Sequence, residues 1–159
     1  MSGFGETLIR SMSDTPVWAE PYDIHSLTSH VDPRGYLFEI LRFKDEDVPG
    51  EGQLYTFSIQ PGQRRGDHYH LKKREWFTCV FGEALILLTS ADGQNQVARL
   101  SATEPKVVYA GVGTTHALIN TQNMVAVIVS YGSKSHDPLD SDTYKKTAFT
   151  EYSVGAETR

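Results

Sequence analysis

The chain has 159 residues, of which 39% are hydrophobic and 22% are charged, and it contains one cysteine. Its length fits one globular domain with its own core and is too short for two. The net charge of −5 argues against nucleic acid as a partner. The longest apolar runs, 84–88 and 124–130, are too short to cross a bilayer. With a single cysteine and no secretion signal, we expect a cytoplasmic protein without a disulfide or a membrane segment.

Short segments rich in β-branched, aromatic and apolar residues follow one another along the chain and are separated by turns containing Gly, Pro, Asn or Asp. The predicted strands span residues 36–43, 54–59, 76–81, 84–88, 96–100, 106–109, 117–120 and 124–131. The predicted domain boundaries are a flexible N-terminal arm (1–16), a barrel (17–152) and a disordered tail (153–159), with one helical turn at 140–146. Many short strands without a long helical pattern predict an all-β closed barrel or jelly roll.

Four side chains that can bind a metal occur at short spacing around this predicted barrel. His68 and His70 alternate with one residue between them and therefore point to the same face, which we take as the interior. Glu75 adds a carboxylate and His116 arrives from a later strand, a set that suits a divalent ion, with zinc expected first. Three histidines and one carboxylate leave positions open for water or substrate. The glycine spacing from Gly62 to Gly82 is typical of a metal-binding cupin, the double-stranded β-helix form of the jelly roll.

Four segments of the sequence resemble known families of sugar-modifying proteins. Residues 65–77 read Arg-Gly-Asp-His-Tyr-His-Leu-Lys-Lys-Arg-Glu-Trp-Phe and residues 82–84 read Gly-Glu-Ala. They resemble the cupin domain of the bifunctional capsular-polysaccharide epimerase–reductases, as does the Asp-Pro-x-x-x-Asp-Thr-Tyr close at 137–144. Residues 32–39, Asp-Pro-Arg-Gly-Tyr-Leu-Phe-Glu, are similar to a signature of nucleotide-sugar 3,5-epimerases and 3,4-ketoisomerases. Together these motifs cover about residues 30–145.

Two positions depart from the family's pattern. Gly111 stands where the family usually has Pro, which loosens the turn before His116, and Leu71 stands where another His is common. No Gly-x-Gly-x-x-Gly follows a predicted strand, so the sequence gives no case for a nicotinamide site. The resemblance therefore implies the cupin half of such a protein.

The resemblance implies an epimerase whose substrate is a nucleoside-diphosphate 4-keto-6-deoxyhexose. Its carbonyl acidifies the protons on C3 and C5, so the site needs a base, a proton donor on the opposite face and positive charge at the enolate oxygen. In the 3,5-epimerases the base is the His that corresponds to His68. If a metal occupies the site, it acts as the Lewis acid and the base lies elsewhere; without a catalytic metal, His68 or His70 is the base. Tyr55 and Tyr131 are the expected proton donors.

Basic residues near the histidines are candidates for binding the diphosphate of this substrate. Arg65 and Arg42 are the first choices, because a guanidinium fork matches phosphate geometry. Arg34 and Glu39 are further candidates, or they form a structural pair near the barrel mouth. The rest of the basic run at 64–74 is either a solvated rim or part of a phosphate site.

Other functions stay open from the sequence. A nucleotide-sugar 3,4-ketoisomerase uses the same enolisation and differs in where the proton returns. A non-catalytic sugar-binding or assembly cupin would keep the ligands without turnover. A metal-dependent oxygenase could use the same His and Glu ligands with iron, although the motifs at 32–39 and 137–144 count against it. We rank the epimerase or isomerase first, the binding module second and the oxygenase third, and we expect a homodimer.

Overall fold

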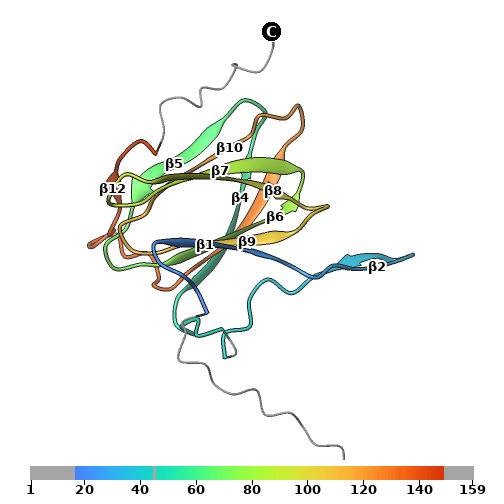
Figure 1. Ribbon diagram of the computed structural model, residues 1–159, viewed down its shortest axis with the longest axis horizontal. Helices are drawn as coiled ribbons and strands as arrows, with labels where there is room; N and C mark the ends of the chain where they lie inside the picture. Colours follow the sequence, from blue (N-terminus) through green and yellow to red (C-terminus); the bar gives the residue numbers. More distant parts are fainter. Residues whose placement is uncertain (1–16, 45, 149–159) are drawn as a thin grey trace, which may run out of the picture.

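The computed structural model describes residues 17–44 and 46–148, and their regular structure consists of strands (Figure 1). These residues contain no helix that is long and apolar enough to cross a membrane. The strands are β1 (Tyr22–Ser26), β2 (His30–Asp32), β3 (Gly35–Leu37), β4 (Gln53–Ile59), β5 (Arg64–Tyr69), β6 (Glu75–Phe81), β7 (Glu83–Thr89), β8 (Asn95–Ser101), β9 (Lys106–Ala110), β10 (Thr115–Ile119), β11 (Ala126–Gly132) and β12 (Tyr144–Lys145).

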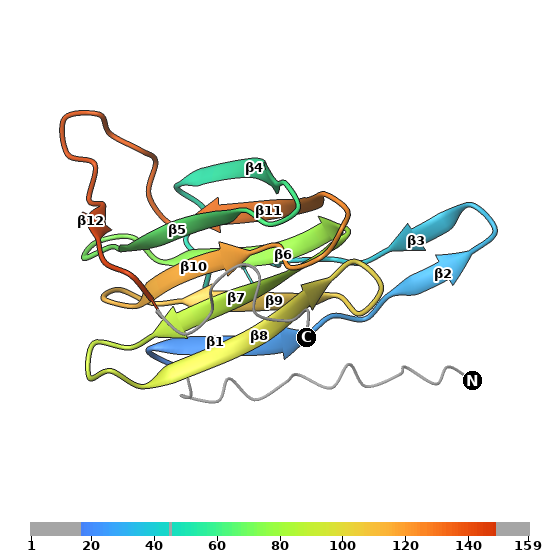
Figure 2. The same cartoon turned by 90° about the horizontal axis from the view of Figure 1, so that it is seen from above.

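Two five-stranded antiparallel sheets form the body of the molecule (Figures 1 and 2). The first sheet has the strand order β1-β9-β6-β11-β4 and the second has the order β12-β5-β10-β7-β8. Neighbouring strands come from distant parts of the chain: β6 pairs with β9 and β11, and β5 pairs with β10. This topology is a jelly roll, and it confirms the predicted all-β cupin fold.

An apolar core fills the space between the two sheets. Because side chains alternate across each strand, every second residue faces this interior. Phe77 and Cys79 on β6, Leu118 on β10 and Ile128 on β11 are at most 2% exposed and pack in one cluster. Burial of each large apolar side chain contributes roughly 1.5–3 kcal/mol. Glu75 lies on the same face of β6 as Phe77 and Cys79, at the start of the strand. The apolar core is therefore directly next to a buried carboxylate.

A second apolar cluster covers the outer face of the first sheet. Its buried members come from three strands and from the segments that precede β1 and β4: Trp18, Val48, Trp76, Val107, Tyr109 and Tyr131. The Tyr131 hydroxyl donates hydrogen bonds to the carbonyl oxygens of Pro49 and Glu51. These bonds tie the loop before β4 to the outer face of the sheet, on the side away from the barrel interior.

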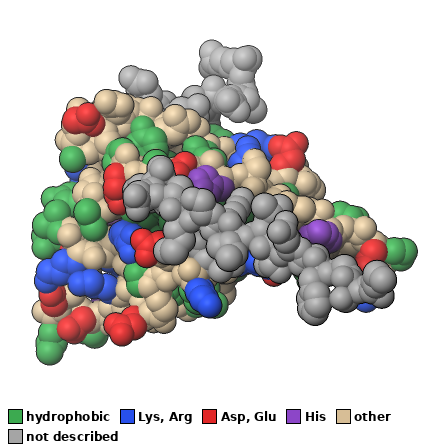
Figure 3. All heavy atoms as spheres, turned by 60° about the horizontal axis from the view of Figure 1, so that its bottom comes forward, with side chains coloured by type: hydrophobic (Ala, Val, Ile, Leu, Met, Phe, Trp, Pro, Cys, Tyr) green, Lys and Arg blue, Asp and Glu red, His purple; other side chains and the backbone are tan. Residues whose placement is uncertain are grey.

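The structure adds strands that the sequence pattern did not predict. Both β1 and β2 are new, and β5 was expected only as the stretch on which His68 and His70 alternate, because Gly66 and Asp67 are poor strand formers. Of the predicted strand at 36–43, only the start is regular: β3 pairs with β2 in a hairpin that projects from the body (Figure 2). The hairpin is the extension on the right of Figure 3, which ends in hydrophobic side chains.

The helical turn predicted at 140–146 is wrong. Turns and bends lead to β12, which pairs with β5 through Tyr144 and Lys145. The reason is that the carboxylate of Asp142 accepts hydrogen bonds from the backbone of the turn after β5, which holds this segment extended across the end of the barrel. The predicted arm at 1–16 and tail at 153–159 lie outside the described residues, so the predicted domain boundaries stay predictions.

Candidate metal centre and active site

Four side chains converge at one end of the barrel interior, and we call them the His/Glu cluster: His68, His70, Glu75 and His116. Their ligand atoms all lie within 4.8 Å of one another. His70, Glu75 and His116 are 3%, 2% and 2% exposed, whereas His68 is only partly buried. The cluster that the sequence predicted is therefore assembled, with His68 as its most accessible member.

Strand pairing brings the cluster together from three segments. His68 on β5 lies directly opposite His116 on β10, and their ring centroids are 4.7 Å apart. His70 follows the end of β5 and Glu75 opens β6, so the short turn between them delivers both side chains to the same point. Tyr69, between the two histidines, instead stacks on Tyr144, as alternation predicts.

A bulge in β5 decides which side chains face the interior beside His68. Gly66 and Asp67 both have positive φ values, 98° and 59°, and the pairing with β10 shifts register here. Leu118 pairs with Arg65 while His116 pairs with His68, so both β5 residues lie on the interior face. A Cβ at Gly66 would lie 2.7 Å from the carbonyl oxygen of His116, which explains the glycine.

The two carboxylate oxygens of Glu75 have different partners. Oε2 lies 3.1 Å from His70 Nε2 and 3.0 Å from His116 Nε2. Oε1 accepts a hydrogen bond of 2.8 Å from the Tyr55 hydroxyl and lies 3.1 Å from the Lys73 ammonium. Burial alone would raise the pKa of Glu75, but the hydrogen bonds from His116 and His70 outweigh burial and hold that pKa well below its usual value. Four polar groups therefore surround the Glu75 carboxylate: the two imidazoles, the Tyr55 hydroxyl and the Lys73 ammonium.

Burial also shifts the pKa of two other groups at this site, His68 and Tyr55. It lowers the pKa of His68 to about 4, with help from the neighbouring His116 and His70, so His68 is neutral at pH 7. It raises the pKa of the Tyr55 phenol, and the charge of Glu75 raises it further. At pH 7 His68 is thus an imidazole with a free lone pair and Tyr55 is a phenol that keeps its proton, although both pKa values lie far from the neutral range that suits proton transfer best.

The donor set fits a divalent metal ion. In both buried histidines Nδ1 faces a backbone carbonyl, that of Asp142 for His70 and that of Thr114 for His116. The Nε2 atoms of these two rings consequently converge on the same Glu75 oxygen. This is the arrangement in which a histidine presents the lone pair of Nε2 to a metal, because its other nitrogen donates to a carbonyl. The cluster can bind a metal with nitrogen and oxygen ligands.

The other predicted site residues lie in different places. Arg65 reaches β4, where its Nε donates to the Ser58 carbonyl at 2.9 Å and its guanidinium lies 5.9 Å from the centre of the Phe57 ring. Tyr55 joins the cluster through Glu75. Tyr131 does not, because it packs in the outer apolar cluster.

The proposed pair between Arg34 and Glu39 does not form. Arg34 lies at the turn of the projecting hairpin and pairs with Asp32, whereas Glu39 pairs with Arg42 at 2.7 Å. The candidates for substrate binding other than Arg65 thus make ion pairs within residues 32–42, close to one another in the sequence: Arg34, Glu39 and Arg42.

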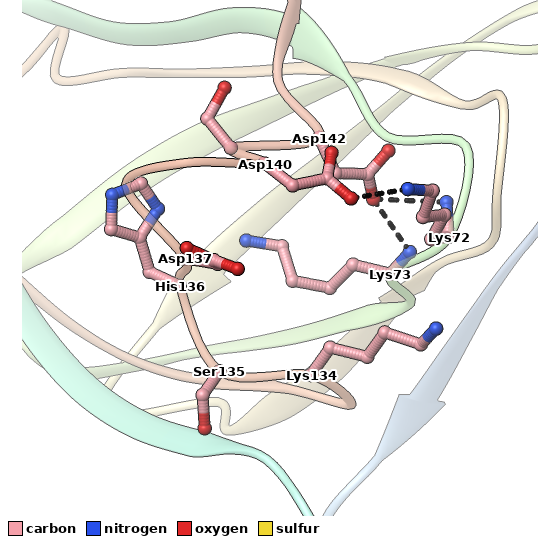
Figure 4. A pocket seen from close by; sticks show the side chains of 9 residues that line it. Lys72, Lys73, Lys134, Ser135, His136, Asp137, Asp140 and Asp142 are labelled. Carbon is pink, nitrogen blue, oxygen red and sulfur yellow. Dashed lines mark hydrogen bonds and ion pairs between the residues drawn. The ribbon is translucent and has the colours of Figure 1, made fainter.

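Lys73 is a neighbour of the cluster that the sequence did not single out. Its side chain is 15% exposed, and its ammonium pairs with Glu75 Oε1. It also lines a pocket of about 270 Å³ between the turn after β5 and residues 134–142, into which its side chain extends (Figure 4). Lys73 thus stands between this pocket and the buried carboxylate. The sequence feature that could have pointed to Lys73 is its position two residues before Glu75, within a run of basic residues. That run alone does not distinguish a buried lysine from a solvated one.

Comparison with known proteins places this chain in a family. The family model of the polysaccharide biosynthesis C-terminal domain matches residues 30–144. The UDP-2-acetamido-2,6-beta-L-arabino-hexul-4-ose reductase of Pseudomonas aeruginosa is 29% identical over 143 residues, which cover 88% of this chain and 37% of the reductase. The spore coat polysaccharide biosynthesis protein SpsL of Bacillus subtilis is 21% identical over 138 residues, 83% of this chain and 91% of that protein. The chain thus spans well under half of the reductase's length.

Solved structures agree on the fold. The capsular polysaccharide assembling protein CapF of Staphylococcus aureus aligns with a TM-score of 0.59 and 28% identity over 76% of this chain and 34% of CapF. ChmJ, a 3'-monoepimerase of Streptomyces bikiniensis, aligns with a TM-score of 0.70 and 19% identity over 79% of this chain and 69% of ChmJ. A dTDP sugar isomerase of Desulfovibrio desulfuricans gives 0.76 at 12% identity, over 87% of this chain and 94% of the isomerase.

Proposed function

Since the chain belongs to the family of polysaccharide biosynthesis C-terminal domains, we propose that it is an enzyme, an epimerase that enolises a nucleoside-diphosphate 4-keto-6-deoxyhexose. The observation that carries this proposal is the composition of the barrel interior. His68 and Tyr55 face it together with the buried, metal-competent part of the His/Glu cluster, and the exposed Arg65 lies on the same face of β5 as His68. A phosphate binder, a proton acceptor and a proton donor therefore surround one site, as enolisation beside a carbonyl requires.

The substrate class follows from the chemistry and from a relative. The Pseudomonas relative is named for a UDP-linked hexul-4-ose, a sugar that carries its keto group at C4. In such a sugar the protons on C3 and C5 are acidic, because the enolate that forms on their removal is stabilised by the carbonyl. We therefore propose a UDP-linked 4-ketosugar as the first substrate to test, with a dTDP-linked one beside it.

The side chains have distinct roles in this reaction. A divalent ion held by the His/Glu cluster, with zinc as the first candidate, would supply positive charge at the C4 carbonyl oxygen. Arg65 binds the diphosphate, since its Nε is engaged by Ser58 and its two terminal nitrogens face no described partner. Tyr55 keeps its proton at neutral pH and donates it to the carbanion centre. Substrate binding through Arg65 orients the ring between Tyr55 and the cluster.

Of the two histidines that are candidates for the base, His68 is the better placed to reach a substrate. Both ring nitrogens of His70 face partners, the Asp142 carbonyl and Glu75 Oε2, so His70 has no nitrogen available for substrate. His68 is neutral and partly exposed, and in a protein without a catalytic metal it removes the proton. Where His68 ligates the ion instead, the base is a group outside the four ligands, and Tyr55 keeps its role as proton donor.

The experiment is incubation of the protein with UDP- and dTDP-linked 4-keto-6-deoxyhexoses, followed by NMR of the products. An inverted centre at C3 or C5 supports the epimerase. A keto group moved from C4 to C3 supports the 3,4-ketoisomerase, the runner-up. Binding of the nucleotide sugar without any product identifies the non-catalytic module, and oxygen consumption with iron identifies the oxygenase.

Three further properties belong to this proposal. We propose a homodimer, which light scattering after size-exclusion chromatography tests. A cytoplasmic location fits the use of a nucleotide sugar. Zinc as the resident ion is tested by elemental analysis of protein purified without added metal.

A further inference from the structure

The segment 137–144, which the sequence singled out by its motif, crosses the end of the barrel beside the His/Glu cluster. Asp142 makes the central contacts of this segment. Its Oδ1 accepts a hydrogen bond of 2.9 Å from the backbone N–H of Leu71, and its Oδ2 accepts bonds of 2.9 Å and 3.0 Å from the N–H groups of Lys72 and Lys73. One carboxylate therefore holds the three residues that follow His70, which form most of the turn leading to Glu75.

The backbone of Asp142 makes a fourth contact, directly to a metal-competent side chain. Its carbonyl oxygen faces His70 Nδ1 at 2.5 Å. A carbonyl oxygen can only accept, so Nδ1 carries a proton and Nε2 is the nitrogen left for Glu75 or for a metal. Asp142 thereby fixes both the position of the turn and the orientation of one ring.

The conformation of Asp142 is specialised for this double contact. Its φ of 46° is in the left-handed region, which Asp, Asn and Gly tolerate better than other residues. Two residues later Tyr144 pairs with Tyr69 and stacks on its ring at 5.3 Å. The segment is thus anchored on both sides of the point where it meets His70.

We propose that Asp142 is a positioning residue for the metal centre: it clamps the turn between His70 and Glu75 and orients His70 so that its Nε2 points into the cluster. This inference rests on the proposed metal-binding site, and it gives the Asp-Thr-Tyr part of the motif a physical role. Loss of an outer partner of this kind lowers metal affinity by about 10- to 100-fold in other proteins.

The test compares Asp142→Gly, Asp142→Asn and Asp140→Asn. Glycine keeps the left-handed backbone and the carbonyl and removes only the carboxylate, and asparagine keeps one acceptor oxygen. Asp140 is the matched control, since it is exposed and pairs only with the Lys72 ammonium. Zinc affinity is measured by competition with a chromogenic chelator. Hydrogen exchange of the His70 Nδ1–H is measured by ¹⁵N NMR on metal-free protein.

We expect zinc affinity to fall about 10- to 100-fold in Asp142→Gly, less in Asp142→Asn, and not at all in Asp140→Asn. Exchange of the His70 Nδ1–H should accelerate in the same order. Wild-type affinity and wild-type exchange in Asp142→Gly overturn the inference. If the wild-type protein binds no zinc, the metal in the proposed function fails and the exchange rates alone decide the role of Asp142. If Asp142→Gly does not fold, Asp142→Asn gives the same readouts.

Discussion

Arg65 and His68 face the same interior although three positions separate them on β5, because the bulge at Gly66 and Asp67 inserts an extra residue between them. Strict alternation would place them on opposite faces. The bulge therefore puts the candidate phosphate binder beside the candidate base, and it depends on a glycine with no room for a side chain.

Replacement of Gly66 by Ala should cost about 3 kcal/mol or more of the free energy of unfolding, because the new Cβ meets the His116 backbone and the φ of 98° is unfavourable. Gly93→Ala is the matched control: its φ is 87° but nothing lies within 4 Å of the new Cβ. That variant should lose about 1 kcal/mol, from strain alone. Urea denaturation measures both, and equal losses would show that the contact with His116 is unimportant.

Replacement of Lys73 by Met should destabilise the metal-free protein by about 3 kcal/mol, because it leaves the buried Glu75 carboxylate without its ammonium partner. The same change should tighten zinc binding by about tenfold, since a cation no longer repels the ion. Lys72→Met is the control, as its pair with Asp140 is half exposed and solvent weakens it, so little change is expected in either quantity. Thermal melts with and without zinc test both effects. Weaker zinc binding in Lys73→Met would contradict this account of Lys73.

The two tyrosines predicted as proton donors should behave differently. Tyr55→Phe should lower kcat by about 100-fold or more with the fold intact, because the hydroxyl beside Glu75 is lost. Tyr131→Phe should instead lower stability by about 1 kcal/mol, through the lost bonds to Pro49 and Glu51, and leave kcat near that of the wild type. Steady-state kinetics and denaturation on the same preparations separate the two. The reverse pattern would assign the donor to Tyr131.

The carboxylate of Asp23 on β1 should make the free energy of unfolding depend on pH in the acid range. Burial alone would raise its pKa, but hydrogen bonds from the backbone of Ala19 and Ile24 and from His25 lower it below 3.8. A lowered folded-state pKa stabilises the protein above the unfolded pKa, and that stability is lost as pH falls through the folded value. Asp23→Asn should therefore be less stable by about 1 kcal/mol at pH 7, and the difference should shrink below about pH 4. A constant difference down to pH 2 would contradict this.

The sequence predicted the fold and the His/Glu cluster because both depend on local regularities. Alternation placed His68 and His70 on one face, and short strands with turn residues between them indicated a jelly roll. The predictions for the tyrosines were less specific, since the face on which Tyr131 lies depends on the pairing of β11 with β6, which no local pattern determines.

Long-range contacts explain what the sequence could not show. Asp142 meets the turn after β5 across about 70 residues of chain, and the helical turn predicted there was wrong for that reason. Lys73 is partly buried where the segment 134–142, distant in sequence, lines the same pocket. The bulge at Gly66 was hidden because an extra residue breaks the alternation by which strands are recognised.

The most direct test of enolisation at this site is to compare the wild-type protein with His68→Asn in the exchange of sugar ring protons in deuterated water. With a UDP-linked 4-keto-6-deoxyhexose, the account predicts loss of the C3 or C5 proton signal at a rate proportional to wild-type enzyme, and loss of that catalysis in His68→Asn. No exchange above the protein-free control, with either the UDP- or the dTDP-linked sugar, would contradict enolisation at this site.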